Sequence, residues 1–184
     1  MLLEGLGVLI MKILIVYESM TGNTKDVAIA IYDALKFDYN VKVLNVVDAL
    51  ESDSRDADLY FLGSWVNRGT SGNLINQFAK TLKNKNIAIF GTAGFGESED
   101  YFKSLTERFV ANIDNSNTFY SSYFCQGRMR EIVKERYIEL LKDHPDDKSL
   151  EVKIENFDKA RQHPNIEDLS LAQKFALEVV QKVK

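Results

Sequence analysis

A short apolar run followed by a turn rich in hydroxyl groups, close to the N-terminus, constrains this chain more than any other feature. Residues 12 to 18, KILIVYE, have the length and composition of a buried strand, and apolar residues recur at helical spacing after Asn23. The turn between the two patterns contains Ser19, Met20, Thr21, Gly22, Asn23 and Thr24. Unpaired N–H groups and the dipole at a helix N-terminus attract anions. The pattern therefore predicts a strand-loop-helix unit that binds a phosphate group.

The spacing in this turn differs from that of two common nucleotide-binding loops. A Walker loop, GxxxxGK[ST], places its lysine before the last hydroxyl residue, whereas here Lys25 follows Thr24. The turn does not match the GxGxxG pattern of dinucleotide-binding domains either. Hydroxyl and backbone groups are then the expected donors to the phosphate. The alternative without a ligand is an ordinary helix cap that is rich in Ser and Thr.

Length and composition indicate a single globular domain. The chain has 184 residues, of which 45% are hydrophobic and 27% charged, and its formal net charge of -4 argues against a nucleic-acid partner. Its apolar stretches are shorter than the ~18 to 20 residues of a membrane span. One cysteine, Cys125, allows no internal disulfide and agrees with a cytoplasmic location. We expect a cytoplasmic protein, whose state as monomer or dimer the sequence leaves open.

The first ten residues, MLLEGLGVLI, resemble the start of a signal sequence but lack its basic segment. Glu4 and Lys12 interrupt the apolar run, and cleavage nearby would endanger the first strand. We expect residues 1 to 10 to form a short N-terminal extension, in keeping with a start codon upstream of Met11. Residues 11 to 184 then form one domain.

Predicted strands and helices alternate along the chain. Further strands are expected at residues 41–45, 59–63, 87–91 and 118–124. Helical patterns cover residues 27–37, 75–82, 102–109, 129–140 and 169–183. Alternation of this kind implies right-handed crossovers and a parallel sheet that is covered on both faces. We expect an α/β fold with a doubly wound, five-stranded sheet in the order 2-1-3-4-5, whose ligand lies beyond the carboxyl ends of strands one and three.

A polar insert is expected at about residues 144–164, where both prolines and charges of either sign occur. It interrupts the domain rather than dividing it. Such a segment is either a solvated face or a docking surface for a partner protein, steered by charge. His144 and His163 each lie beside a proline, without the Cys or carboxylate spacing of a metal site, so no metal is expected.

The loops after the later strands should converge on the ligand of the first loop. The loop after the third strand contains Ser64, Trp65, Val66, Asn67, Arg68 and Gly69. Trp65 is the only tryptophan, and its ring is suited to stacking on a planar ligand. The alternative is an indole that packs over the sheet as part of the core.

The loop after the fourth strand contains Thr92, Ala93, Gly94, Phe95 and Gly96. Its glycines let the backbone approach a ligand closely, and Phe95 supplies a second aromatic wall. The alternative is a plain glycine-rich turn.

The turn after the fifth strand contains Cys125, Gln126 and Gly127. Gln126 and the backbone near Gly127 are candidates for hydrogen bonds to the edge of a pyrimidine-like ring. Cys125 is either a redox thiol or, as buried cysteines usually are, a small hydrophobic residue.

These residues make the chain resemble the flavodoxin family from Met11 to Lys184. The turn at residues 19–24 matches the [ST]-x-T-G-N-T loop with which the family holds the phosphate of FMN. A narrower similarity is to the small flavodoxin-like branch that accompanies bilirubin reductase in gut bacteria. It is carried by the stretches GSWVNRGT at 63–70, FCQGRM at 124–129 and HPNIEDLSLAQKFA at 163–176. The resemblance implies a flavodoxin-like fold and one FMN, bound non-covalently by the loop residues named above.

The resemblance also implies that FMN carries electrons between a reductase and an acceptor, which for the narrower branch means bilirubin reduction through a larger oxidoreductase partner. FMN supplies the chemistry, so no catalytic acid, base or nucleophile is expected. One alternative is an FMN-dependent NAD(P)H oxidoreductase that acts alone. The sequence has no second nucleotide signature and no evident basic pocket for a nicotinamide phosphate. Another is a binding module that has lost the flavin, which the intact first loop disfavours.

Charges near the expected flavin depart from the family pattern. The resemblance implies carboxylates around the flavin, which disfavour its reduced, anionic form. Here the loops carry both signs, with Arg68, Arg128 and Arg130 against Glu97, Glu99 and Asp100. One charge at ~4 Å and an effective dielectric constant of about 20 contributes roughly 4 kcal/mol, or well over ~100 mV for one electron. We expect a less negative reduction potential than in strongly acidic flavodoxins.

Overall fold

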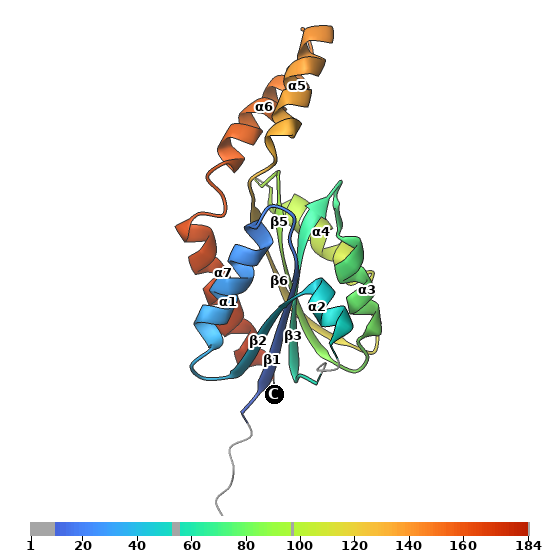
Figure 1. Ribbon diagram of the computed structural model, residues 1–184, viewed down its shortest axis with the longest axis vertical. Helices are drawn as coiled ribbons and strands as arrows, with labels where there is room; N and C mark the ends of the chain where they lie inside the picture. The colour runs from blue at the N-terminus through green and yellow to red at the C-terminus, as the bar shows by residue number, and fades with distance from the viewer. Residues whose placement is uncertain (1–9, 53–55, 97, 184) are drawn as a thin grey trace, which may run out of the picture.

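A parallel β-sheet forms the centre of the molecule (Figure 1). The computed structural model describes residues 10–52, 56–96 and 98–183. The strands β1 (Lys12–Glu18), β2 (Asn40–Asn45), β3 (Leu59–Asn67), β5 (Asn86–Ala93) and β6 (Thr118–Gln126) lie in the order β2-β1-β3-β5-β6. The short strand β4 (Thr70–Ser71) pairs with the end of β3 in the antiparallel sense. The predicted order 2-1-3-4-5 of the parallel strands is confirmed.

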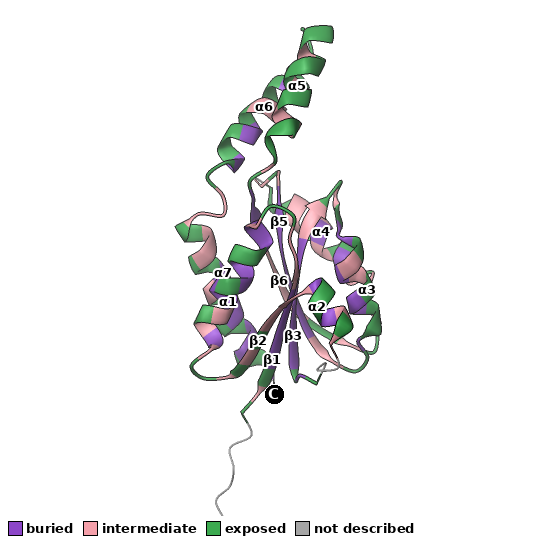
Figure 2. Cartoon of the chain, viewed as in Figure 1, coloured by how far each residue is buried: buried purple, intermediate pink, exposed green. Residues whose placement is uncertain are grey.

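Helices cover both faces of the sheet (Figure 1). The helices α1 (Asn23–Leu35) and α7 (Ile166–Lys182) lie on one face, and α2 (Val46–Glu51), α3 (Asn73–Thr81) and α4 (Glu99–Val110) on the other. Side chains of a strand alternate between the faces. In β1, Ile13 and Ile15 therefore join the core beneath α1 and α7, and Leu14 and Val16 join the opposite core. Burial on both faces (Figure 2) explains the continuous apolar runs of the strands.

Strand register brings the predicted loops to one edge of the sheet. Glu18 at the end of β1 pairs with Ser64 of β3, Trp65 pairs with Thr92 of β5, and Ala93 pairs with Gln126 of β6. Parallel strands point the same way, so the segments that follow these residues emerge next to one another.

Two predicted loops are partly strand. β3 continues to Asn67 and turns back into β4 through Arg68 and Gly69, which have φ angles of 50° and 81°. Arg108 of α4 holds this turn by donating from Nη1 to the carbonyl oxygen of Gly69 at 2.8 Å. β6 likewise continues through Cys125 to Gln126. These extensions were missed because the strand ends carry polar and glycine residues that are typical of loops.

A helical hairpin connects β6 to α7 and projects beyond the carboxyl edge of the sheet (Figure 1). It consists of α5 (Glu131–Asp143) and α6 (Lys148–Ala160) and is largely exposed (Figure 2). α6 lies in the segment for which the sequence predicts only a polar insert. The side chain of Asp147 caps α6 by accepting from the Ser149 N–H at 2.9 Å. The buried apolar residues of α6 are Leu150, Phe157 and Ala160. With so few apolar residues among many charges, the helical period is weak.

The predicted division into an extension at residues 1–10 and one domain over residues 11–184 stays a prediction, since residues 1–9 lie outside the described part of the chain. Within that part, no helix is both long and apolar enough to cross a membrane.

Asn156 of α6 joins the hairpin to the sheet edge. Its buried side chain donates from Nδ2 to the carbonyl oxygen of Gly94 at 2.9 Å, and its Oδ1 accepts from Gln126 Nε2 at 3.0 Å. Two ion pairs hold α5 to α6, with Lys134 Nζ at 2.6 Å from an Asp158 oxygen and Arg161 Nη2 at 2.6 Å from a Glu131 oxygen. The hairpin is thus tied internally and fastened at a polar junction.

Replacing Asn156 with Ala should loosen the hairpin without unfolding the sheet. The substitution removes both bonds of the Asn156 amide, and a buried polar group left without its partner costs ~1 to 3 kcal/mol. We expect faster amide hydrogen exchange in α5 and α6 and unchanged exchange in α1 and α7. Glu155→Ala, at the exposed neighbouring position, is the control. Equal exchange in both variants would show that Asn156 does not hold the hairpin.

Candidate functional site

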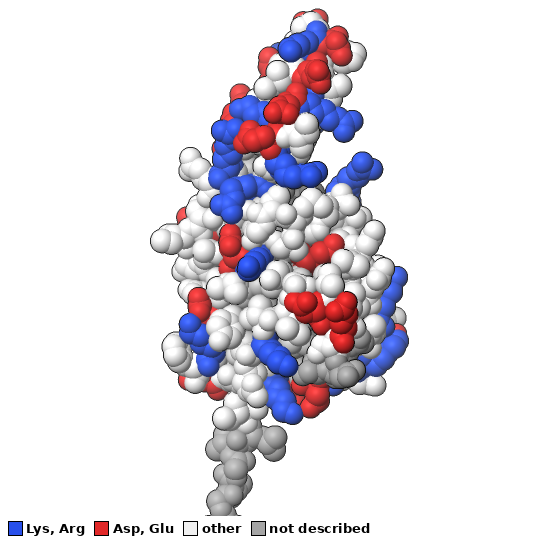
Figure 3. All heavy atoms as spheres, in the orientation of Figure 1, with Lys and Arg blue, Asp and Glu red and all other residues white. Residues whose placement is uncertain are grey.

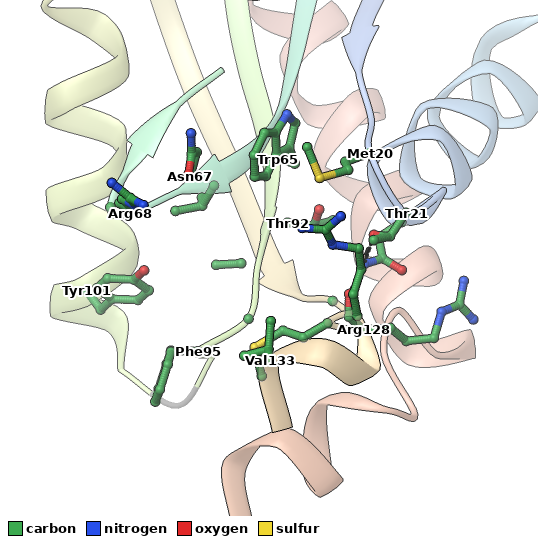
Figure 4. Close-up of a pocket in the computed structure, with 18 of the residues that line it drawn as sticks. Met20, Thr21, Trp65, Asn67, Arg68, Thr92, Phe95, Tyr101, Arg128 and Val133 are labelled. Atoms are coloured by element: carbon green, nitrogen blue, oxygen red, sulfur yellow. Dashed lines mark hydrogen bonds between the residues drawn. The ribbon is translucent and has the colours of Figure 1, made fainter. Parts of the chain in front are cut away.

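A cavity of about 760 Å³ opens at the carboxyl edge of the sheet (Figure 4). Its size falls in the range of ~300 to 1,000 Å³ that is typical of small-molecule sites. The cavity is surrounded by the turn after β1, the carboxyl ends of β3 and β5 with the residues that follow them, the segment after β6, the start of α4 and the first half of α5. It brings together many of the predicted site residues, namely Met20, Thr21, Asn23, Trp65, Val66, Asn67, Arg68, Gly69, Thr92, Ala93, Gly94, Phe95 and Gly127.

The turn after β1 presents unused backbone donors at the N-terminus of α1. Within the described chain, no hydrogen bond uses the backbone N–H groups of residues 21 to 24. Gly22 is the N-cap residue and has a φ angle of 90°, a conformation that favours glycine. Because glycine has no side chain, it forms no side-chain cap bond with the N–H groups of the first turn. Free N–H groups at a helix N-terminus form an anion site. The predicted phosphate loop thus has the donors that its role requires.

Asn23 links this turn to the end of β6. Its side chain, 4% exposed, donates from Nδ2 to the carbonyl oxygen of Arg128 at 2.8 Å and to Thr21 Oγ1 at 2.9 Å. A Cβ on Gly127 would lie 2.7 Å from Asn23 Nδ2, so this close approach requires glycine. Asn23 Oδ1 is buried and has no hydrogen-bond partner among the described residues. A buried acceptor without a donor is unfavourable, and it points to a missing ligand group.

Trp65 is held in position by hydrogen bonding. Its Nε1 donates to Oε1 of Glu18 at 3.3 Å, and Oε2 of the same carboxylate accepts from the Ile75 N–H at 2.9 Å in the first turn of α3. A Cβ on Gly72 would lie 2.3 Å from Glu18 Oε2, so glycine makes room for the carboxylate. Trp65 is half-buried, as suits a ring that both packs and faces a ligand.

Other aromatic rings face the same space from different elements. Figure 4 shows Tyr101, from the first turn of α4, and Phe95, from the segment after β5, around the space that Trp65 also borders. Burial raises the pKa of Tyr101, so its hydroxyl group stays protonated at neutral pH. The cavity therefore combines an anion-binding end with aromatic walls, which suits a ligand that has a phosphate group and a planar ring.

Several lining residues were not predicted, and these are Tyr101, Met129, Val133 and Tyr137. Val133 and Tyr137 are four residues apart and so share one face of α5. Their helical spacing is visible in the sequence, but it is equally typical of a helix that packs on a core. Only the position of the hairpin places this face on the cavity.

Four predicted residues lie outside this cavity but close to it. Ser19 and Gly22 border a neighbouring cavity of about 550 Å³, which shares Met20 and Trp65 with the first. Thr24 is buried with its Oγ1 at 2.9 Å from Thr92 Oγ1. Ser64 Oγ, also buried, donates to the Trp65 carbonyl oxygen and accepts from the Gly72 N–H, both at 2.8 Å. Thr24 and Ser64 thus position the loops.

Gly96, Cys125 and Gln126 border a different cavity, of about 530 Å³, beside α6 and α7. The amide of Gln126 is engaged with Gly94 and Asn156. Cys125 is 4% exposed, and burial raises the pKa of its thiol to about 12, so the group stays protonated and poorly nucleophilic. Of the two predictions for Cys125, the structure favours the small hydrophobic residue.

The charged side chains that line the cavity are basic. Arg68, Arg128 and Arg130 border it, and no carboxylate does so among the described residues. Glu99 and Asp100 lie in α4 outside the lining, and Glu97 lies outside the described residues. The sequence predicts Arg68, Arg128 and Arg130 near the ligand, and all three border the cavity. The absence of a basic pocket for a nicotinamide phosphate stays a prediction. Arg68 is far from the other two arginines in the sequence and meets them only through the sheet register.

The described residues contain no cluster of three or more His, Cys, Asp or Glu side chains placed to hold a metal ion. None of the described residues that line the cavity is His, Cys, Asp, Glu or Lys.

Comparison with known proteins agrees with this architecture. The sequence matches the family described as Flavodoxin domain over residues 14–177. It is 34% identical over 166 residues to the flavodoxin-like domain-containing protein BilS of Clostridioides difficile (strain CD3), covering 90% of this chain and 94% of that protein. A protein of the same description from Clostridium symbiosum (strain WAL-14163) is 28% identical over 183 residues, covering 92% and 96%.

Among solved structures, oxidised Flavodoxin 2 from Bacillus cereus shares the fold with a TM-score of 0.55 and 18% sequence identity, covering 93% of this chain and 99% of that one. Both BilS relatives agree with the narrower similarity predicted from the sequence. The matched family extends from β1 to α7 and includes the loop with the unused N–H donors. The chain therefore belongs to the flavodoxin family, the FMN-binding α/β proteins that its sequence indicated.

Proposed function

We propose that this protein binds FMN non-covalently in the 760 Å³ cavity and carries electrons to a partner oxidoreductase. One observation carries the proposal: Thr21 and Asn23, whose backbone N–H groups are unused, and the rings of Trp65 and Tyr101 border the same cavity, at the edge where a doubly wound sheet binds ligands. When bound, FMN supplies the one- and two-electron chemistry. The protein holds it, shields it and sets the charge around it.

The site residues named from the sequence remain our proposal for the cofactor contacts. Residues 19–24 hold the phosphate, and the segments after β3, β5 and β6 surround the ring. To these we add Tyr101, Val133 and Tyr137, because they line the same cavity. Thr24, Ser64 and Gln126 act by positioning, since their polar groups already bond within the protein.

An electron carrier fits this cavity better than an enzyme that acts alone. Proton transfer to a substrate commonly uses His, Glu or Asp side chains, and the described lining contains none of them. We place the protein in the cytoplasm. We also propose that its partner reduces bilirubin, because its relatives are BilS proteins and its sequence resembles the branch that accompanies bilirubin reductase.

A second candidate is an FMN-dependent NAD(P)H oxidoreductase, and a specific observation favours it. Arg68, Arg128 and Arg130 border the cavity, and arginine is well suited to binding phosphate groups. We still prefer the electron carrier. The three arginine side chains are exposed at the rim of the site, where they can bind a partner protein as well as a nucleotide phosphate.

Spectroscopy and an anaerobic titration distinguish these functions. We expect the purified protein, or the protein reconstituted with FMN, to show the visible absorption of bound flavin. NADH or NADPH alone should bleach that band only slowly, and a flavodoxin reductase added with NADPH should bleach it rapidly. Fast bleaching by either nucleotide alone would identify the oxidoreductase. Failure to bind FMN would refute both functions.

Thr21→Asp should weaken FMN binding at least tenfold. The new carboxylate would face the phosphate, and like charges ~4 Å apart repel by roughly 4 kcal/mol at a dielectric constant of about 20, before screening at this exposed position reduces the effect. Titration of FMN fluorescence gives the dissociation constant. Thr118→Asp, exposed at the start of β6 and far from the cavity, should bind FMN normally. Equal affinity of the two variants would show that the phosphate site is misplaced.

Arg68→Asn should make the reduction potential of the bound flavin more negative. The positive side chain stabilises the anionic, fully reduced flavin, and Asn tolerates the φ angle of 50° at this position. For an exposed charge we expect a shift on the order of tens of mV after screening. Potentiometry should find Lys80→Asn, which removes an exposed charge from the last turn of α3, unchanged. A potential unaffected by Arg68→Asn would contradict this electrostatic explanation.

A further inference from the structure

Three exposed arginines, Arg68, Arg128 and Arg130, border the cavity, and a fourth, Arg136, lies exposed on α5, which forms part of the cavity wall. We call these four the basic rim. Arg68 lies in the β3–β4 turn, and Arg128 and Arg130 follow β6. Arg136 lies on α5, three residues after Val133, which faces the cavity. Figure 3 shows a band of blue side chains where the hairpin leaves the body of the domain. The whole chain carries a formal charge of -4, so positive charge is concentrated at this place.

Little of the positive charge on the rim is neutralised by neighbouring carboxylates. Within the described chain, no ion pair includes Arg68, Arg130 or Arg136. Of the four arginines, only Arg128 forms an ion pair with a described residue, with its Nη2 at 3.3 Å from an Asp26 oxygen. The nearby carboxylates Glu131 and Asp158 are bound by Arg161 and Lys134. Glu135 and Glu139 are the other exposed acids next to Arg136 on α5, fewer than the three arginines without an ion pair. The rim therefore keeps a net positive charge.

Exposed apolar side chains accompany the basic rim. Met20 is 53% exposed and Phe95 is 39% exposed, and both border the cavity. Ile132, at the start of α5, is 58% exposed. An apolar centre with a polar rim is the usual anatomy of a protein–protein interface, and exposed apolar groups gain free energy when a partner covers them.

We propose that this face is the docking surface for an acidic redox protein, whose carboxylates meet the basic rim and whose redox centre comes close to the flavin. The proposal rests on the proposed function, because it supplies the partner for an FMN carrier. Opposite charge steers the encounter and selects the partner more than it adds affinity. The charge of the basic rim is opposite to that expected around the flavin of strongly acidic flavodoxins. The partners of this chain should therefore be acidic where the partners of those flavodoxins are basic.

A protein suits the surface better than a nucleic acid or a membrane. The rim offers only four arginines, with the carboxylates of Asp26, Glu131 and Glu135 among them. Polyanions are bound by longer basic stretches, and the chain as a whole is acidic. Electron transfer, in addition, needs a partner that carries a redox centre.

Cytochrome c in two charge states is the probe for this surface. Native cytochrome c is basic, and succinylation of its lysines makes it acidic while it keeps the same haem. The FMN-loaded protein is reduced without oxygen and mixed with each form, so that every electron leaving the flavin converts one ferric haem to ferrous haem. At low ionic strength we expect at least tenfold faster reduction of the succinylated form. Added salt should slow that reaction and speed the reaction with native cytochrome c, until the two rates converge.

Charge-reversal variants locate the effect. Arg130→Glu combined with Arg136→Glu should abolish or invert the preference for the acidic cytochrome. The matched control, Lys142→Glu combined with Lys148→Glu, makes the same change in net charge at the exposed far end of the hairpin and should keep the preference. The flavin potential of each variant is measured as well, so that a changed driving force is separated from a changed encounter.

Three results would overturn the docking surface: faster reduction of native cytochrome c by the wild-type protein, a preference without salt dependence, or equal effects of the rim and control variants. Co-sedimentation with vesicles of anionic phospholipid at physiological salt would assign the rim to a membrane instead. If the rim variant fails to fold, the salt dependence of the wild-type protein still decides. These results differ from a failure of the proposed function. If the protein did not bind FMN, no FMN-loaded protein could be prepared for the cytochrome experiment.

Discussion

The parallel pairing of β1 with both β2 and β3 is the constraint on which the rest of this structure depends. With β1 inside the sheet, both of its faces need an apolar cover, which α1 and α7 provide on one side and α2 and α3 on the other. The same pairing directs the carboxyl ends of the strands to one edge. The turn at residues 19–24 therefore opens beside the ends of β3, β5 and β6, and a cavity forms there whose walls come from distant parts of the sequence.

Buried polar contacts keep this edge in a fixed arrangement. Asn23 ties the first turn to the segment after β6, and Thr24 of α1 forms a hydrogen bond with Thr92 of β5. Glu18 links Trp65 to the start of α3. Thr24 and Asn23 are buried, so breaking their bonds would leave a buried polar group without a partner, which is costlier than the net gain of forming the bond. Donors and rings are therefore positioned before a ligand arrives, and binding loses less conformational entropy.

The helical hairpin contributes to both proposed roles of this edge of the sheet. It adds Val133 and Tyr137 to one wall of the cavity and Arg136 to the basic rim. The arginines of this region serve two proposed roles through one field: a positive potential stabilises a reduced, anionic flavin, and it attracts an acidic partner to the same place. Redox potential and partner choice are thus coupled, because the same side chains contribute to both.

The sequence by itself determined the elements whose signals are local. The strand-turn-helix unit at residues 12–35 follows from periodicity and turn chemistry within a short window. The alternation of such units along the chain then predicts the order of the parallel strands. Only the tertiary structure decided which side chains face the cavity. The sheet register brought the carboxyl ends of β3 and β5, with Trp65 and Thr92, to one cavity, whereas Cys125 and Gln126 at the end of β6 border another beside α6 and α7. The basic rim and the wall formed by α5 likewise depend on how the hairpin is fastened at Asn156, a contact between residues 62 positions apart that no local pattern encodes.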